Sequence, residues 1–377
     1  MKNRRIHRPA PALALMAAVA ALCAAPPAPA QAGPASSASS VTVYGIADIG
    51  VVGERGGAAG DVTKLTSGPA SASRIGFKGS EDLGGGLSAF FILEAGYSLD
   101  TGGFASANTL FNRLALVGLR GGAGSVSVGR QATPYHNTLV AVADPFGTGY
   151  AGTIKNAFPD WGTNVRASNT VIVATPDLNG LGADLFYSPG EQAGSADAGR
   201  QTGASFGYSS ARFNVRLAYN HKNADTAATP DAPAVRRGSG SNKLLAANYD
   251  LGPARVFLAV GIDRGFNSAP LGNTGNPYAG AAPTASTDGR EALLGVTVPL
   301  STGTVMASFM HKDDRTPFNQ DANAWGVGYI HPLSRRTSLY AAYGSIGNRN
   351  GAGYTVANNT EAGSGDRAYN LGLRHNF

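Results

Sequence analysis

Apolar and polar residues alternate in short runs along most of the chain. In the stretch SRIGFKGS (73–80), Arg74 and Lys78 fall on one face, and Ile75 and Phe77 fall on the other. A period of two is typical of a β-strand with two different faces. The runs are bounded by Gly, Pro, Asn and Asp, and glycine alone totals 52 residues. The pattern therefore predicts an all-β protein.

This alternation predicts sixteen strands along the chain. They lie near residues 41–53, 72–80, 86–98, 109–119, 125–133, 168–175, 182–189, 202–210, 211–221, 242–250, 254–264, 288–298, 303–312, 322–331, 337–346 and 368–377. The last of them ends on an aromatic residue. In YNLGLRHNF (369–377), one face carries Tyr369, Leu371, Leu373, His375 and Phe377.

The connections between these strands alternate in length. Short joints such as EDLGGG (81–86) and GGAG (121–124) follow every second strand, and long polar segments such as 134–167 and 347–367 lie between them. Short turns on one side and long loops on the other are typical of a transmembrane antiparallel β-barrel. An even number of strands places both termini on the side of the short turns.

The number of strands also predicts which face of each strand meets lipid. A barrel of sixteen strands is too wide for side chains to fill. Its apolar face must therefore point outward into the bilayer, with water inside. In FNRLALVGLR (111–120), Leu114 and Leu116 then face lipid, and Arg113 faces the lumen. After residue 30, no apolar run approaches the ~20 residues of a transmembrane helix.

The N-terminus has the pattern of a secretory signal peptide over residues 1–30. Four basic residues precede an alanine-rich apolar run at 12–25, and small residues follow, so cleavage is expected after Ala30 or Ala32. The barrel is then residues 33–377.

Removing the signal leaves 26 basic against 24 acidic residues, and the net charge falls from +6 to +2. The basic composition is thus no argument for nucleic-acid binding. The single cysteine, Cys23, lies in the signal.

Four stretches resemble the general porins of Gram-negative outer membranes, especially those of the β-proteobacterial and neisserial type. They are SVTVYGIADIGV (40–51), SRIGFKGSEDLGGGLSAFFILEAGYSLDTG (73–102), FNRLALVGLRGGAGSVSVGRQ (111–131) and RASNTVIVATPDLNGLGADLFY (166–187). The resemblance implies a homotrimer in outer-membrane lipid and lipopolysaccharide, with one water-filled pore per subunit for passive diffusion of small ions and hydrophilic solutes. It implies no cofactor. It also implies that Phe377, with Tyr369, forms a signal for the outer-membrane assembly machinery.

The resemblance also implies where the pore is narrowest. The third long connection, 134–167, is expected to fold inward and to present Asp144 and Asp160 to a cluster of wall arginines. The matching positions are Arg74, Arg113 and Arg166, with Lys78 and Arg130 as weaker candidates. Alternation independently places Arg74 and Arg113 inward, whereas Arg130 shares its face with Val126 and Val128. Three cations opposite two anions predict a weak preference for anions. The alternative for each arginine is a structural ion pair with a neighbouring acid.

Other functional classes find little support in the sequence. GTGYAG (147–152) matches a dinucleotide-binding spacing, but it neither follows a strand nor opens a helix. The histidines lack the spacing of metal ligands, and none belongs to a serine–histidine motif of a barrel phospholipase. An enzyme is therefore not expected. A substrate-specific channel remains the alternative, because the third loop carries a set of aromatic residues that could stack on a sugar: Tyr135, Phe146, Tyr150, Phe158 and Trp161.

Overall fold

The computed structural model describes residues 40–272 and 282–377. The signal peptide expected at residues 1–30 and both of its cleavage sites lie outside the described residues. Seventeen strand segments form one antiparallel sheet. They are β1 (Ser40–Arg55), β2 (Val62–Ser67), β3 (Arg74–Gly84), β4 (Leu87–Gly96), β5 (Leu114–Gly121), β6 (Gly124–Ala132), β7 (Arg166–Ala174), β8 (Leu181–Ser188), β9 (Gln201–Ser209), β10 (Phe213–Asn223), β11 (Ser239–Asp250), β12 (Arg255–Gly265), β13 (Asp288–Leu300), β14 (Gly303–Asp314), β15 (Ala322–Pro332), β16 (Thr337–Asn348) and β17 (Arg367–Asn376).

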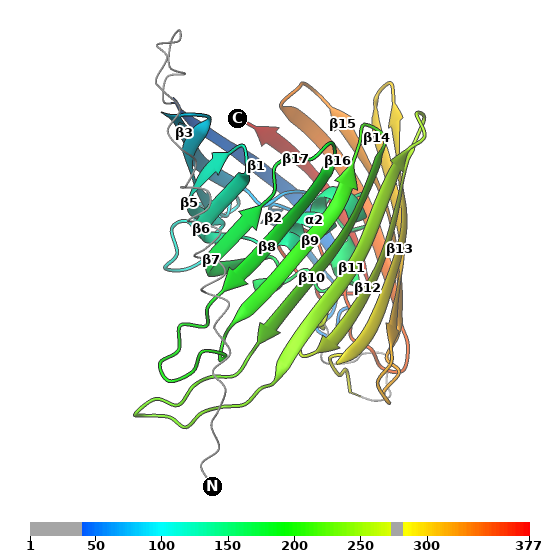
Figure 1. Cartoon of the computed structure of the whole chain (residues 1–377). Helices are drawn as coiled ribbons and strands as arrows, with labels where there is room; N and C mark the ends of the chain where they lie inside the picture. The colour runs from blue at the N-terminus through cyan, green and yellow to red at the C-terminus, as the bar shows by residue number, and fades with distance from the viewer. Residues whose placement is uncertain (1–39, 273–281) are drawn as a thin grey trace.

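The sheet closes into a barrel of sixteen strands, as the alternation predicts (Figure 1). Closure is made by β1 and β17, which pair from Ile46↔Asn376 to Arg55↔Arg367. Strands β2 and β3 both pair with β1, so together they occupy one position in the barrel wall. Gly68–Ser73 separates them, and this interruption was not anticipated. Each of the sixteen predicted strands overlaps an observed one.

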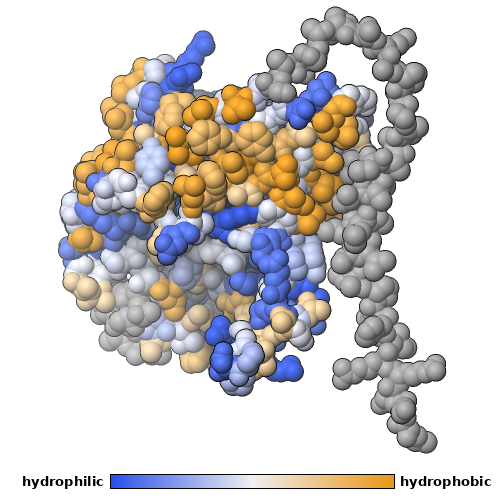
Figure 2. Space-filling view, turned by 90° about the vertical axis from the view of Figure 1, so that its left-hand side faces the viewer, coloured by the Kyte–Doolittle hydropathy of each residue, from blue (hydrophilic) through white to orange (hydrophobic). Residues whose placement is uncertain are grey.

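Side chains alternate between lipid and lumen, and on most strands they do so as the pattern predicts. On β5 the predicted faces are wrong: Leu114 and Leu116 lie on the inner face, opposite Glu94 and Ile92, and Val117 is exposed on the outer surface. On β12, Leu258, Val260 and Ile262 are exposed on the outer surface, whereas Phe257 and Asp263 are buried on the inner one. A belt of hydrophobic residues crosses the outer surface, and hydrophilic residues collect toward the end that carries the long loops (Figure 2). This is the surface expected of a barrel that spans a bilayer.

The third long loop, residues 133–165, lies inside the barrel. It contains the short helix α2 (Pro134–Thr138) and the single turns η1 (Leu139–Ala143), η2 (Ile154–Asn156) and η3 (Gly162–Asn164). Ser308 on the inner face of β14 donates a hydrogen bond to the carbonyl of Gly152 (2.8 Å). On β15, a Cβ at Gly326 would lie 2.2 Å from the Cα of Gly152, so this contact requires glycine.

The main hydrophobic cluster of the molecule is formed where this loop meets the inner wall. Tyr135, Leu139, Ile154 and Phe158 are all fully buried there. The lumen is too wide for the side chains of the wall to fill, and the apolar residues of this loop fill part of it. In residues 40–272 and 282–377, no helix is long and apolar enough to cross a membrane.

The final long loop, residues 349–366, also enters the lumen, which the sequence did not indicate. Its residues Tyr354 and Val356 are buried. Asn359 donates from its side-chain amide to the carbonyl of Thr148 (3.0 Å), and its own carbonyl accepts from Lys155 Nζ (2.9 Å). The third and final loops therefore hold each other in place inside the barrel.

Candidate pore constriction

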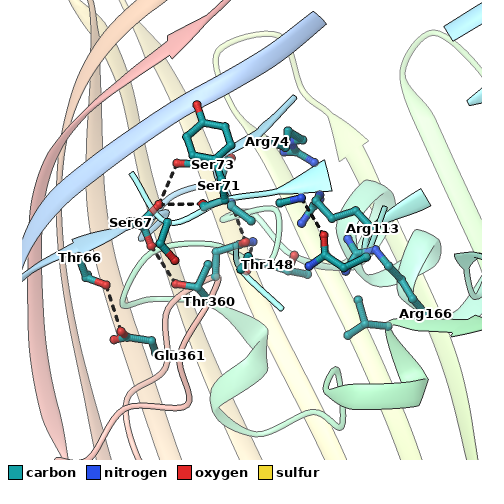
Figure 3. Close-up of a pocket in the computed structure, with 18 of the residues that line it drawn as sticks. Thr66, Ser67, Ser71, Ser73, Arg74, Arg113, Thr148, Arg166, Thr360 and Glu361 are labelled. Atoms are coloured by element: carbon teal, nitrogen blue, oxygen red, sulfur yellow. Dashed lines mark hydrogen bonds between the residues drawn. The ribbon is translucent and has the colours of Figure 1, made fainter. Parts of the chain in front are cut away.

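A cavity of about 550 Å³ lies between the third loop, the final loop and the wall formed by β2 to β7 (Figure 3). All three parts contribute polar side chains to it. The lining includes Thr66, Ser67, Ser71, Ser73, Arg74, Asp100, Asn112, Arg113, His136, Val140, Gly147, Thr148, Lys155, Arg166, Asn359, Thr360 and Glu361.

The three arginines implied by the family resemblance come together at this cavity. Arg74 and Arg166 are the first residues of β3 and β7, and Arg113 immediately precedes β5. All three lie at the long-loop ends of their strands, so they reach the lumen at a similar height (Figure 3). A guanidinium stays protonated even in a confined site. The arginines are therefore fixed positive charges on one wall.

Glu94 on β4 is bound to this cluster, and the sequence reading did not single it out. Its Oε1 accepts from Arg113 Nε (2.6 Å) and lies 3.7 Å from Arg74 Nη1. Its Oε2 accepts from the hydroxyl of Tyr44 (3.0 Å). Its inward direction could have been inferred from the pairing of β3 with β4, because Glu94 lies opposite Gly76, which shares the inward face of Arg74. The alternative of a structural ion pair thus applies most directly to Arg113.

Arg166 lacks a comparable partner. In the part of the chain that the structure describes, its buried Nε has no hydrogen-bond partner, and no ion pair involves its side chain. Its charge is therefore not cancelled by direct contact with an acid. Because burial removes water from one side of the guanidinium, its field extends further into the cavity than that of an exposed arginine.

Lys155 of the third loop adds a fourth cation, which the sequence reading missed. Its ammonium donates to the carbonyl of Asn359 (2.9 Å) and lies 4.2 Å from the ring centre of Trp161. Burial lowers the pKa of Lys155, and the positive charges of Arg166 and Arg113 act in the same direction. Its position depends on the final loop, and no spacing in the sequence revealed that contact.

Asp144 requires a correction, because the structure does not place it opposite the arginines. It is buried within its own loop, where its carboxylate accepts from the backbone amides of Phe146 (3.0 Å), Thr148 (2.8 Å) and Ile154 (3.0 Å). Burial raises the pKa of Asp144 to about 6, despite these hydrogen bonds. The residue shapes the loop and does not line the cavity.

Asp160 is also buried instead of facing the pore. Its Oδ1 lies 2.7 Å from Nδ1 of His136, which itself lines the cavity. Burial acts to raise the pKa of Asp160, but the charge and hydrogen bond of His136 outweigh it, with help from Lys155 and Arg166, so the pKa lies below its ordinary value. The third-loop residues that line the cavity are His136, Val140, Gly147, Thr148, Lys155 and Val165, so this loop contributes no carboxylate to it.

The two weaker candidates do not line the cavity. Lys78 is exposed nearer the short-turn end of β3, with its ammonium 5.3 Å from the ring centre of Tyr44. Arg130 donates from Nε to the carbonyl of Asn112 (2.6 Å) and from Nη1 to Ser168 Oγ (2.9 Å). A bulge between Gly129 and Gln131 accompanies this orientation. Both residues are useful as controls for the lumen cations.

Two acids line the cavity from loops. Asp100 comes from the loop between β4 and β5, and the other is Glu361 of the final loop. Its Oε2 lies 2.6 Å from Lys64 Nζ, and its Oε1 accepts from Thr66 Oγ1 (3.0 Å). On the far wall, Lys312 is fully buried between Asp263 (2.8 Å) and Glu291. The carboxylates of Glu361, Asp263 and Glu291 therefore each contact a lysine and not an arginine of the wall.

The aromatic residues of the third loop do not form an exposed track. Tyr135, Phe146, Tyr150 and Phe158 are at most 3% exposed and pack in the hydrophobic cluster. Trp161 lies against Lys155. Sugar stacking, which the substrate-specific alternative needs, would require exposed ring faces. In residues 40–272 and 282–377, no group of three or more His, Cys, Asp or Glu is arranged to hold a metal ion.

The terminal aromatic residues lie where β17 closes the barrel. Phe377 and Gly45 exchange two backbone hydrogen bonds, of 3.0 and 3.1 Å, and the Phe377 ring covers Gly45. Tyr369 likewise covers Gly53 and lies 5.4 Å from the guanidinium of Arg55. The residues implied as an assembly signal thus belong to the closing seam.

Comparisons with known proteins agree with this architecture. The chain is 29% identical over 341 residues to an outer membrane porin protein of Bordetella pertussis, covering 83% of this chain and 84% of that protein. It is 29% identical over 339 residues to outer membrane porin protein 32 of Delftia acidovorans, covering 85% and 89%. Among solved structures, the anion-selective porin from Comamonas acidovorans matches with a TM-score of 0.72 and 25% identity, covering 90% of this chain and all of that one.

The Gram-negative porin family matches residues 17–351. This span includes the barrel wall through β16, the third loop, and all three arginines of the cavity. The sixteen-stranded barrel, its hydrophobic belt and its polar lumen are the structural properties of that family. The chain therefore belongs to the Gram-negative porins, the passive channels of the outer membrane.

Proposed function

We propose that this porin conducts small anions in preference to cations. The observation that carries the proposal is the unequal charge of the two sides of the cavity. Arg74, Arg113 and Arg166 line one side, whereas Asp144 and Asp160 are turned away from it. The related porin from Comamonas acidovorans, named as anion-selective, adds support.

The expected preference is moderate. Lys155 brings the cations at the cavity to four, and Glu94 and Asp100 offset two of them, so a surplus of about two charges faces the cavity. In water, a unit charge ~8 Å from a passing ion contributes about 0.5 kcal/mol, and ~0.1 M salt screens over roughly 10 Å. Two such charges change the relative permeability by several-fold and do not exclude cations. The channel therefore remains a general pore for small hydrophilic solutes.

A pair of double variants tests this assignment. Arg74→Ala with Arg113→Ala removes two cations and leaves Glu94 unpaired, so the reversal potential in a salt gradient should shift toward cations. Lys78→Ala with Arg130→Ala removes the same charge outside the cavity and should leave the reversal potential unchanged. Equal reversal potentials in the two double variants would show that the arginines do not set selectivity.

We also propose that the chain works as a homotrimer, as the family resemblance implies. Native mass spectrometry of the detergent-purified protein should give three times the mass of the mature chain. A monomer that conducts with the same reversal potential would exclude the trimer and leave the anion preference intact. The proposal of a trimer can therefore be excluded without excluding the proposal of an anion preference.

The terminal aromatic is proposed to direct assembly. Phe377→Ala keeps the backbone hydrogen bonds to Gly45 but removes the ring, whereas Phe377→Tyr keeps an aromatic ring. We expect low outer-membrane levels for the first variant and normal levels for the second. One exposed aromatic contributes about 1–3 kcal/mol of burial, so the refolded barrel should lose little stability. Normal membrane levels of Phe377→Ala would exclude a signalling role.

A further inference from the structure

Asp48 is a buried carboxylate on the inner face of β1, in the stretch SVTVYGIADIGV (40–51), and it does not line the cavity. Its Oδ2 accepts a hydrogen bond from the backbone amide of Ser71 (2.6 Å). Its Oδ1 accepts from the hydroxyl of Tyr340 on β16 (2.7 Å). Burial of a carboxylate is costly unless hydrogen bonds compensate for the lost water. Both contacts are therefore needed to keep Asp48 in this position.

The segment that Asp48 holds is the connection between β2 and β3, residues 68–73, which we call the inward turn. The carbonyl of Asp48 accepts from the amide of Gly68 (2.9 Å) and from Ser73 Oγ (2.9 Å), and its amide donates to Ser73 Oγ (3.1 Å). Together with the Ser71 amide, these contacts bind both ends and the middle of the turn to one residue. Ser71 and Ser73 line the cavity, so the turn projects into the lumen (Figure 3).

Both lumen loops are fastened to the inward turn. The carbonyl of Pro69 accepts from the backbone amides of Tyr150 in the third loop (2.8 Å) and of Asn359 in the final loop (3.1 Å). The amide of Ala72 donates to the side-chain carbonyl of Asn359 (2.9 Å). Ala70 packs in the hydrophobic cluster together with the third loop. One turn of the wall thus positions the two loops that border the cavity.

The tip of the third loop is strained where it meets the inward turn. Thr148 and Tyr150 both have a φ of 62°, in the left-handed region that residues with a Cβ rarely adopt. Between them, a Cβ at Gly149 would lie 2.0 Å from the carbonyl oxygen of Ala70, so the two main chains are in direct contact. A strained backbone persists only where its surroundings hold it. The inward turn supplies that support, and Thr148 lines the cavity.

A second route also joins Asp48 to the tip of the third loop. Tyr340, whose hydroxyl binds the carboxylate, lies edge-on to Tyr150, with ring centres 5.1 Å apart. A Cβ at Gly372 of β17 would lie 2.2 Å from the Tyr340 hydroxyl, so glycine is required there for the tyrosine to reach across to β1. The carboxylate therefore contacts both the support of the tip and the ring that packs against it.

We propose that Asp48 is a positioning residue for the pore, because it folds the inward turn that holds the tip of the third loop in its strained conformation. Without the carboxylate, the Ser71 amide and the Tyr340 hydroxyl lose their acceptor, and the turn loosens. The tip then relaxes away from the turn, and the space between them joins the cavity. The proposal concerns the width of the pore, so it holds whichever ion the pore prefers.

Single-channel recording of Asp48→Asn tests this role. Asparagine keeps the size of the side chain but offers one acceptor oxygen in place of two, so the mean conductance and the open-channel current noise should both rise. Asp184→Asn is the matched control. Asp184 of β8 is also an inward carboxylate, but its partners, Ser205 (2.7 Å) and Arg216 (3.2 Å), belong to the wall. Conductance and noise that stay unchanged in Asp48→Asn, or that change equally in both variants, would overturn the proposal.

Two further measurements keep the test independent of a folding defect. Tyr340→Phe removes only the hydroxyl that binds Asp48 and keeps the ring beside Tyr150, so the conductance should shift in the same direction by a smaller amount. Residues 31–377 contain no cysteine, so a spin label at Ala362→Cys reports on the final loop alone. The label should be more mobile with Asp48→Asn than with Asp184→Asn. Equal mobility, or an unaltered conductance of Tyr340→Phe, would show that the loops are positioned without Asp48.

Discussion

The Nε of Arg113 lies 2.6 Å from Oε1 of Glu94, so the arginine wall of the pore contains its own counter-ion. The same carboxylate oxygen lies 3.7 Å from Arg74. One negative charge therefore fixes two guanidinium groups in the lumen and cancels part of their field. Ion selectivity therefore depends on the net charge of Arg74, Arg113 and Glu94 together, and not on the arginines alone.

Glu94→Gln should strengthen the anion preference. The substitution removes one negative charge beside Arg74 and Arg113 and keeps a polar side chain of the same size. A unit charge ~8 Å from the ion path contributes about 0.5 kcal/mol, so the permeability ratio should rise about two- to threefold. Glu81→Gln, on the exposed short-turn end of β3, is the control. A reversal potential that moves equally in both variants would contradict this role of Glu94.

The anion preference should decrease at alkaline pH because of Lys155. Burial lowers the pKa of this lysine below its ordinary value of 10.5. As pH rises through the lowered pKa, the ammonium loses its proton, and the cavity loses one positive charge. The reversal potential should then move toward cations at a pH where exposed lysines remain charged. Lys155→Met should remove this alkaline step, and a step that persists in Lys155→Met would assign it to another group.

Asp144→Ala should loosen the third loop without removing a charge from the cavity surface. Its carboxylate accepts from three backbone amides and from Thr153 Oγ1. A buried donor left without an acceptor costs about 1–3 kcal/mol. We expect greater open-channel current noise with little change in reversal potential. Asp231→Ala, in an exposed loop, is the control, and equal noise in both variants would argue against this role for Asp144.

Gly45→Ala should weaken the closing seam. A Cβ at this position would lie 2.3 Å from the Phe377 ring and 2.5 Å from the carbonyl oxygen of Arg74. Overpacking of this kind costs about 1–3 kcal/mol. The temperature at which the band of the folded protein disappears in gel electrophoresis should therefore fall. At Gly347 the nearest atom would be 3.9 Å away, so Gly347→Ala is the matched control. Equal unfolding temperatures for the two variants would show that the seam does not limit the stability of the barrel.

The strands were predictable because each strand position meets only one of two solvents. Positions that face lipid carry apolar side chains, as at Ile75 and Leu258, and positions that face water carry polar ones. The sequence therefore shows the alternation directly. The β2 segment was missed because Gly68–Ser73 breaks the alternation. The interruption of the barrel wall there is stabilised by the loops, with the carbonyl of Pro69 accepting from Tyr150 and Asn359. No local pattern encodes those partners.

The site was predictable where it lies on the wall and not where it lies on loops. The inward direction of Arg74 follows from strand alternation. Arg113 reaches the lumen from the residue before β5, where Leu114 pairs with Glu94 on the inner face, so alternation along β5 does not account for its direction. Lys155 is held by Asn359, more than 200 residues away in sequence, so only the folded structure brings the two together. Asp144 offered a partial signal, because the run DPFGT (144–148) is typical of a turn in which the aspartate accepts from its own backbone.

The reversal potential of the unaltered porin in a tenfold potassium chloride gradient across a planar bilayer tests the central claim most directly. The surplus of cations contributed by Arg74, Arg113, Arg166 and Lys155 predicts a reversal potential displaced from zero toward the chloride equilibrium potential. The displacement should be partial, because a few-fold preference still admits potassium. A reversal potential at zero, or one displaced toward the potassium equilibrium potential, would contradict the account.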